Sequence, residues 1–421
     1  MTLIRGKHIL HFGGEFLFYR DNSTAWGNIN GGTMGYTGVY TSSTQGDSTT
    51  GLAYADFLLG QTHSWSAQVT PEYGGRMRLP QMFIQDDYKV RPNLTLNIGL
   101  RYQIQSGWGE VKGNMRAFDP NVRNPATDTM GAMWYGSTHA NGRTTLQKPV
   151  YNTFLPRFGF AWQVTPKTNL RGGFGLYAYN WSLDTYSGGM GSAFGTQGNL
   201  TDQSNGVTPV VILSSDGSSL PYIAASTDPA AFNHQNVTYN KYHTPVGGSY
   251  QWNLSLQREL NTNMVFQLAY VASHGHDLPF PVDINQIPED KLDPNDVALG
   301  YRPYTQYNQI NGNTVNAISN YNSLQASIQT RMTHGLQFNA NYVWAHFLDD
   351  MDSSGWGSRA GAQTYQRAYT PSANYGNSNF DVRNAIKGSF VYQLPFGRGR
   401  QFLNNIIFLD EIFGGWQGSG T

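Results

Sequence analysis

The chain has 421 residues, with 27 basic and 27 acidic side chains and a formal net charge of zero. This balance argues against nucleic-acid binding, which needs a basic surface, and the absence of cysteine excludes disulfides and thiolate metal sites. Charged residues make up 13% of the chain and aromatic residues 14%, with a mean hydropathy of -0.45. Soluble domains usually carry about 25% charged residues, whereas a transmembrane barrel can be polar with few charges.

The N-terminal residues lead directly into a strand pattern over residues 7–19. We find no apolar stretch of a signal peptide before it, and no apolar run reaches the ~18 residues of a membrane helix. A polar segment follows to about residue 80, within which Ala55–Gly60 predicts one helical turn. Strands are therefore the only elements expected to cross a membrane.

The clearest alternation lies in residues 81–105, where two strand patterns flank the turn at residues 91–93. A period of two predicts a β-hairpin with one apolar and one polar face. The apolar face carries Leu94, Leu96, Ile98, Leu100, Tyr102 and Ile104, and the polar face carries Thr95, Asn97, Gly99, Arg101 and Gln103. We expect the first set to face lipid and the second to face water.

Further strands are predicted in pairs joined by short turns at residues 165–169, 261–263 and 333–335. The strand patterns cover residues 157–164, 170–179, 252–260, 264–270, 324–332, 336–344 and 386–394, and a last one begins at Trp416. Between the pairs lie polar segments, centred near residues 50, 130, 215, 297 and 365, that are much longer than the connections usual in compact domains. Short turns on one side and long loops on the other predict an all-β, antiparallel transmembrane β-barrel of about eleven strands.

Several segments carry a family resemblance. FIQDDYKVRPNLTLNIGLRYQ looks like a barrel hairpin of TonB-dependent outer-membrane receptors. Segments that resemble the Oar-like branch of that family are, in chain order, GKHILHFGGEF, ADFLLGQ, FLPRFGFAWQVTPKTNLRGGFGLYA, NYNSLQASIQTRMTHGLQFNANYVWAH, FDVRNAIKGSFVYQLPFGRGR and GGWQGSG. The resemblance covers nearly the whole chain.

This resemblance implies a 22-stranded barrel in a bacterial outer membrane, with an N-terminal plug whose TonB box couples uptake to the inner membrane. The sequence departs from that pattern, because signal peptide, plug, TonB box and C-terminal strands are not found in it. We therefore expect residues 1–421 to form a partial barrel, about eleven strands of the expected 22.

One acidic cluster has calcium-loop spacing. Counted from Asp350, oxygen ligands would come from Asp350, Asp352 and Ser354, followed by Gly355. The match fails at Gly361, where the bidentate glutamate should stand, so a solvated acidic loop is the alternative reading.

Other candidates are weaker. His274 and His276, followed by Asp277, lack a third fixed metal ligand, and the glycine-rich segment 188–195 does not fit a nucleotide-binding motif. Asp86 falls on an apolar face, so we expect it near a membrane interface or hydrogen-bonded by a neighbour. Aromatic residues on the apolar faces suit the aromatic girdles at the two membrane interfaces; they are Tyr88, Tyr102, Trp162, Tyr342 and Trp344. Aromatic residues in the loops could instead stack on sugars.

We find no nucleophile triad or paired carboxylates, so no catalytic, cofactor-binding or metal residues are assigned and no enzyme activity is predicted. The leading hypothesis is TonB-dependent uptake of an unknown solute, with outer-membrane lipid and the TonB complex as partners. A non-transporting adhesion or secretion barrel is the first alternative, and a soluble extracellular β-sandwich enzyme is the second.

Overall fold

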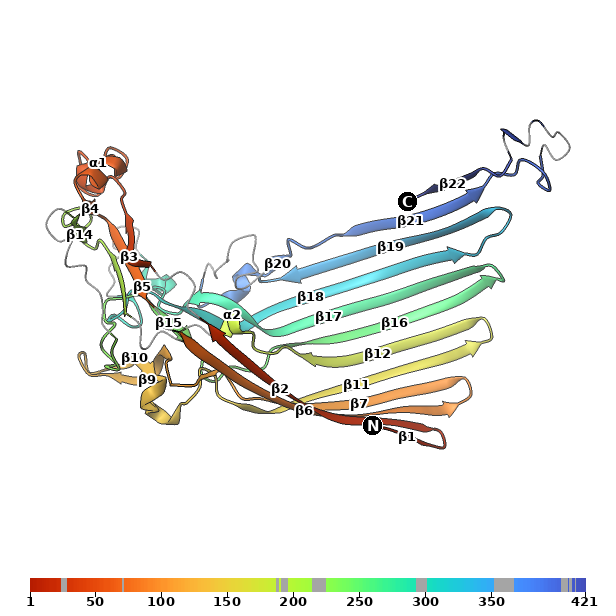
Figure 1. Cartoon of the computed structure of the whole chain (residues 1–421), viewed down its shortest axis with the longest axis horizontal. Helices are drawn as coiled ribbons and strands as arrows, with labels where there is room; N and C mark the ends of the chain where they lie inside the picture. The colour runs from red at the N-terminus through yellow and green to blue at the C-terminus, as the bar shows by residue number, and fades with distance from the viewer. Residues whose placement is uncertain are drawn as a thin grey trace.

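The computed structural model describes residues 1–23, 29–69, 72–186, 189–190, 196–213, 225–292, 301–351, 367–402, 408, 411–412 and 414–421. Twelve of its strands form one antiparallel wall in which each strand pairs with the next along the wall (Figure 1). Across the wall they are β1 (Thr2–Arg5), β2 (His8–Ser23), β6 (Tyr73–Arg91), β7 (Leu94–Gln105), β11 (Val150–Thr165), β12 (Thr168–Ala178), β16 (Gly248–Asn261), β17 (Met264–Asp283), β18 (Ile310–Thr330), β19 (Leu336–Asp349), β21 (Asn384–Gln393) and β22 (Gln417–Gly420).

The connections of this wall alternate in length. Tight turns lie at one end, on the right in Figure 1, and most long connections lie at the other. The exception is the longer segment of residues 394–416, which joins β21 to β22 at the tight-turn end. The predicted turns at residues 91–93, 165–169, 261–263 and 333–335 all lie at the tight end. The predicted sidedness of an outer-membrane barrel is therefore confirmed, although the loop centres near residues 215, 297 and 365 fall outside the described residues.

One strand was not predicted separately. β1 pairs with β2 through a two-residue turn at Gly6 and Lys7, where Gly6 has a φ of 60°. Two-residue hairpins need such a positive φ, which glycine adopts without strain. The wall therefore contains the eleven predicted strands and this short additional one.

Several strands run further than their alternating pattern. β17 reaches Asp283 and β18 starts at Ile310, although the apolar alternation covers only residues 264–270 and 324–332. Alternation is needed only where one face meets lipid. Beyond that zone both faces meet water or protein, so the sequence no longer marks the strand.

The loop end carries further elements of the described chain. The wall's sheet gains five short strands there and becomes 17-stranded, and two small sheets lie beyond it. The added strands are β8 (Gly109–Glu110), β9 (Arg116–Asn124), β10 (Thr129–Tyr135), β15 (Val237–Asn240) and β20 (Gly376–Asn377). The small sheets contain β3 (Ile29–Gly35), β5 (Ser64–Val69) and β13 (Thr196–Thr201), and β4 (Gln61–Thr62) with β14 (Val211–Ile212).

Helices are short. They are α1 (Ala53–Leu58) and α2 (Leu183–Tyr186), with 3-10 turns η1 (Val39–Thr41), η2 (Gly136–Thr138), η3 (Ala140–Gly142), η4 (Glu289–Lys291) and η6 (Pro371–Asn374). α1 confirms the helical turn predicted within residues 55–60. No helix in the described part of the chain has the length and apolar character to cross a membrane.

The buried core of the described chain lies largely at the loop end rather than along the wall. Its largest cluster joins the β9–β10 hairpin to residues of other loops, including Trp108, Trp134, Leu146 and Trp181. The long polar segment predicted near residue 130 is wrong for this hairpin, whose side chains are largely buried. In β9 the apolar side chains are interspersed with Arg, Asp and Asn, whereas β10 has no polar residue after Thr129, so neither strand shows a clean period of two.

Candidate functional site: the polar face of the wall and the loop head

The two faces of the wall have opposite character. Cross-strand partners share a face, so Leu100 lies with Ile84 and Pro156, whereas Asn97 lies with Asp87 and Gly159. Large apolar side chains stay exposed on the first face, among them Phe12, Met82, Ile84, Ile98, Leu100, Phe158, Trp162, Leu254, Leu256, Leu324, Trp344 and Ile386. A contiguous apolar face of this extent suits contact with lipid.

The apolar stretch of β7 has the length of a membrane crossing. From Leu94 to Ile104 the strand advances about 34 Å at ~3.4 Å per residue, and a tilt of roughly 45° reduces this to about 24 Å. The lipid-facing band of outer-membrane barrels is about 25 Å tall. Aromatic rings mark both ends, because Trp162 lies opposite Leu94 and Phe154 lies opposite Tyr102.

Asp86 is the acidic exception on this apolar face. Its Oδ2 lies 2.7 Å from Nδ1 of His8, whose ring stacks on Tyr88 with centroids 4.3 Å apart. His8 directly follows the β1–β2 turn, so the pair lies toward the tight-turn end of the wall. The predicted neighbour hydrogen bond is confirmed, and it offsets the cost of a carboxylate beside lipid.

The opposite face carries polar side chains and a hollow floored by glycine. Two rows of directly paired residues cross β6, β7, β11, β12 and β16. The first row is Gln85, Gly99, Arg157, Gly175 and Gln251, and the second is Asp87, Asn97, Gly159, Gly173 and Asn253. The four glycines leave a cavity of about 200 Å³ whose rim includes Arg157, Tyr177 and the amides.

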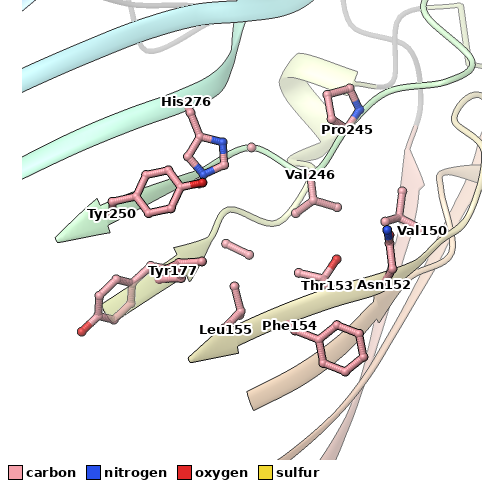
Figure 2. A pocket seen from close by; sticks show the side chains of 14 residues that line it. Val150, Asn152, Thr153, Phe154, Leu155, Tyr177, Pro245, Val246, Tyr250 and His276 are labelled. Carbon is pink, nitrogen blue, oxygen red and sulfur yellow. The ribbon is translucent and has the colours of Figure 1, made fainter. Parts of the chain in front are cut away.

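A second cavity lies next to the first, toward the loop end (Figure 2). β11 pairs with β12 only from Arg157 onward, whereas its earlier residues pair with β7 alone. The strands therefore separate, and a cavity of about 240 Å³ opens between β11 and residues 245–248. Tyr250 and His276 border it, with ring centroids 4.8 Å apart, and Tyr177 lines both cavities.

A buried ion pair holds the loop head together, by which we mean the β9–β10 hairpin with residues 140–147 and β15. Nη1 of Arg143 lies 2.9 Å from Oδ2 of Asp119, and the two side chains are 1% and 7% exposed. The guanidinium also donates to the carbonyls of Leu146 and Asn240 and lies 4.2 Å from the ring centroid of Trp134. Burial lowers the pKa of Arg143, and the adjacent Asp119 opposes that shift.

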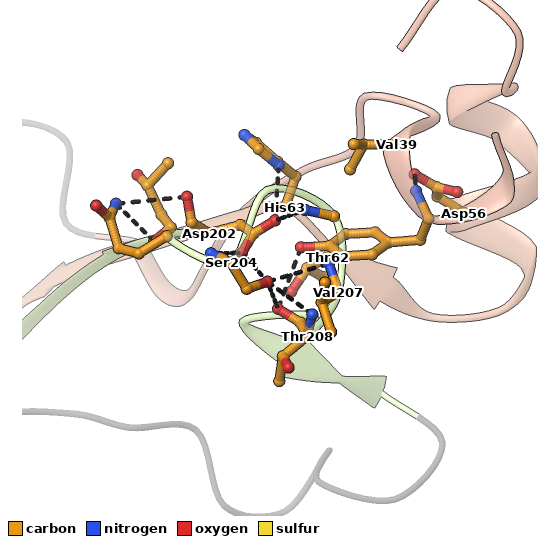
Figure 3. A network of polar contacts seen from close by, with 12 residues as sticks. Val39, Asp56, Thr62, His63, Asp202, Ser204, Val207 and Thr208 are labelled. Carbon is orange, nitrogen blue, oxygen red and sulfur yellow. Dashed lines mark hydrogen bonds and ion pairs between the residues drawn. The ribbon is translucent and has the colours of Figure 1, made fainter. Parts of the chain in front are cut away.

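A smaller polar network closes the outermost loops (Figure 3). Asp202 accepts hydrogen bonds from the backbone of Ser204 and Gly206 at 2.6 and 2.7 Å, and its Oδ2 lies 3.9 Å from Nδ1 of His63. Burial raises the pKa of Asp202, but these hydrogen bonds outweigh it, so the pKa lies below its usual value. Asp56 of α1 similarly accepts from the amide of Gly38 at 2.8 Å.

Only the first residue of the calcium-loop pattern, Asp350, lies within the described chain. Asp350 is 6% exposed, and its Oδ1 accepts a hydrogen bond of 2.9 Å from the amide of Ile318. Asp352, Ser354, Gly355 and Gly361 lie outside the described residues. Within the described chain, no group of three or more His, Asp or Glu side chains is arranged to hold a metal ion. Calcium binding by Asp350 and Asp352 remains a hypothesis.

The remaining candidates have local structural partners. His274 lies 2.7 Å from Oδ1 of Asn320, and His276 lies 2.8 Å from Oδ2 of Asp277. In the glycine-rich segment 188–195, only Gly189 and Met190 are described, and Met190 is part of the buried core. Sequence reasoning did not single out Arg157 or the glycine hollow. The signal was present as glycines on the polar faces of three successive strands.

Comparison with protein families identifies the class of this wall. Residues 1–421 match the family described as outer membrane beta barrel domain. The chain therefore belongs to this family of bacterial outer-membrane proteins, which confirms the predicted fold class and localisation. No curated protein matches the sequence.

Three solved structures are similar to this chain. The outer membrane transporter YddB from Escherichia coli has 10% identity and a TM-score of 0.46, and the match covers 98% of this chain and 43% of YddB. For the alcaligin receptor FauA from Bordetella pertussis the identity is 10% and the TM-score 0.35, with 92% of this chain and 44% of FauA covered. For the iron transporter FrpB from Neisseria meningitidis the identity is 9% and the TM-score 0.41, with 93% of this chain and 40% of FrpB covered. The chain thus spans less than half the length of each.

Proposed function

We propose that this chain forms part of the wall of an outer-membrane transporter that takes up a solute with energy supplied through TonB. The supporting observation is the two-sided wall, which has an apolar face suited to lipid and an opposite polar face with a hollow lined by neutral amides and Arg157. A polar inner face of this kind suits a lumen through which a solute passes. The proposed coupling to TonB is supported by the resemblance of the hairpin at residues 83–103 to TonB-dependent receptors.

The structure of the loop head favours binding of a solute at the loop end over free diffusion of solutes through the barrel. Its buried ion pair and aromatic core place ordered protein at the loop end of the wall. A packed head can present fixed contacts to a solute, since ordering entropy is spent on folding and not on binding. This reading leaves the soluble β-sandwich enzyme without support, because the family is an outer-membrane one.

Uptake can be tested without knowing the solute. Cells that express the whole transporter to whose wall residues 1–421 contribute would be incubated with mixed ferric chelates, oligosaccharides and peptides, and depletion of each from the medium would be followed by mass spectrometry. The expected result is that at least one compound disappears faster in a host with TonB than in a matched host without it. Equal depletion in both hosts would contradict TonB coupling, and cell adhesion without any uptake would favour the adhesion alternative.

A further inference from the structure

Among the described residues, the guanidinium of Arg157 has no anionic partner. It projects from β11 on the polar face and is half-buried, and its Nε is buried without a hydrogen-bond partner in the described chain. The guanidinium lies over the ring of Tyr177, whose centroid is 4.7 Å from Cζ. A partly desolvated cation gains most from an oxyanion that accepts two parallel hydrogen bonds.

The nearest acid in the two paired rows is already occupied. Asp87 lies in the neighbouring row, and its carboxylate accepts hydrogen bonds from Asn97 at 2.7 Å and Gln85 at 3.1 Å. Nε2 of His11 lies 3.6 Å from its other oxygen. Around Arg157 itself the hollow is bordered by the amides of Gln85, Asn97, Gln251 and Asn253, so it offers one positive charge and several neutral hydrogen-bonding groups.

The glycines give a ligand access to that charge. A Cβ built at Gly159 or Gly173 would come no closer than 3.5 Å to any neighbour, which is ordinary van der Waals contact. Packing therefore does not require glycine at these two positions. Bare backbone within a strand is a place where a ligand can approach closely, and here it forms the floor beside Arg157.

We propose that this hollow binds the carboxylate of a small solute, with Arg157 as the recognising cation and the surrounding amides as additional hydrogen-bond donors. The inference rests on the proposed function, which directs this face toward the lumen, and it names the ligand chemistry of that lumen wall. Tyr177 holds the guanidinium by stacking and also borders the cavity between β11 and residues 245–248. The two cavities are therefore adjacent on the polar face, with Tyr177 between them.

Chemical labelling of arginine tests this site directly. The full chain, refolded into phospholipid vesicles, would be treated with phenylglyoxal with and without citrate, and the modification rate of each arginine would be measured by mass spectrometry. Citrate should slow modification of Arg157 at least fivefold, and neutral trehalose should not. Arg171 is the matched control, because it lies on the same face of the adjacent strand and is exposed.

A second variant separates the hollow from the charge. Gly173→Val fills the floor but keeps Arg157, so the expected result is continued labelling of Arg157 with no protection by citrate. Equal protection of Arg157 and Arg171, protection by trehalose, or unchanged protection in Gly173→Val would overturn the proposal. The readout needs neither uptake nor TonB, so failure of the transport assay and failure of this site remain distinguishable.

Discussion

Leu100 and Arg101 are neighbours in β7, yet their side chains meet different surroundings. Leu100 is 41% exposed on the apolar face, whereas Nη1 of Arg101 donates to Oε1 of Gln81 on the polar face at 2.9 Å. The alternation of a strand enforces this difference, and a shift of one residue would exchange the two environments. Substitutions at adjacent positions are therefore expected to have unequal costs.

Leu100→Arg should destabilise the membrane-inserted state by about 2–4 kcal/mol, the cost of an arginine near the bilayer midplane. Asn97→Arg should be close to neutral, because the new guanidinium faces Asp87 on the polar side. The measurement is the free energy of unfolding from lipid vesicles in guanidinium chloride. Similar costs for both variants would contradict the assignment of the apolar face to lipid.

The pair of His8 and Asp86 makes a second residue-scale prediction. His8→Phe keeps a ring against Tyr88 but removes the hydrogen-bond partner of Asp86, and should cost about 1–3 kcal/mol. Adding Asp86→Leu should recover most of that loss, since no polar group is then left without a partner. A double-mutant cycle in vesicles measures the coupling, and strictly additive effects would show that the pair does not interact.

At the scale of elements, Arg143 links several segments of the loop head. Arg143→Ala should cost about 3–5 kcal/mol locally, because it leaves Asp119 buried without its cation. We expect faster proteolysis within residues 106–149 and unchanged protection of the wall. The exposed pair of Arg123 and Asp128 is the control: Arg123→Ala should have little effect, and equal sensitivity of both variants would contradict the proposed role of Arg143.

The outermost network predicts a pH dependence. Because the folded-state pKa of Asp202 lies below its ordinary value of 3.8, its contribution to stability is present above that value and is lost as pH falls through the lower, folded-state pKa. Hydrogen exchange at the amide of Gly206, which donates to Asp202, should accelerate in this acidic range. Asp202→Asn should remove the pH dependence, and an unchanged profile in that variant would exclude Asp202 as its origin.

The predictability of the strands follows from what each of them faces. Where β7 crosses the lipid zone, one face must be apolar, so its register and turn could be predicted from sequence alone. β9 and β10 instead bury side chains from Ala117 to Trp134 against other loops, and β15 joins β9 and β18 through pairings distant in sequence. Such contacts depend on tertiary packing, which the local periodicity of the sequence does not predict.

The candidate site was less predictable for a related reason. Arg157 and Gly173 each satisfy the strand pattern alone, and only the register between β11 and β12 brings the glycines and the guanidinium together. The hydrogen bond of Asp86 was predictable because a carboxylate on an apolar face needs a partner. That this partner is His8 depended on the pairing of β2 with β6.

At the scale of the whole molecule, the wall is open among the described residues. β1 pairs only with β2, and β22 pairs only with β21, so two strands present unpaired edges. Unpaired backbone groups are very unfavourable in lipid and promote association in water. We therefore expect the 421-residue chain by itself to form no channel of defined conductance in a planar bilayer.

Cross-linking can show whether the wall closes, and the cysteine-free sequence makes the test clean. Val391 and Ser419 lie directly opposite each other in β21 and β22, so cysteines at both positions should form a disulfide on mild oxidation. Cysteines placed singly at Thr2, Leu3, Ile4 or Arg5 of β1 should form none with Ser419→Cys within one chain, because their Cα atoms must come within about 7 Å. An intramolecular disulfide at any of these four positions, formed as fast as the Val391–Ser419 control, would mean that β1 and β22 pair and that the barrel is closed.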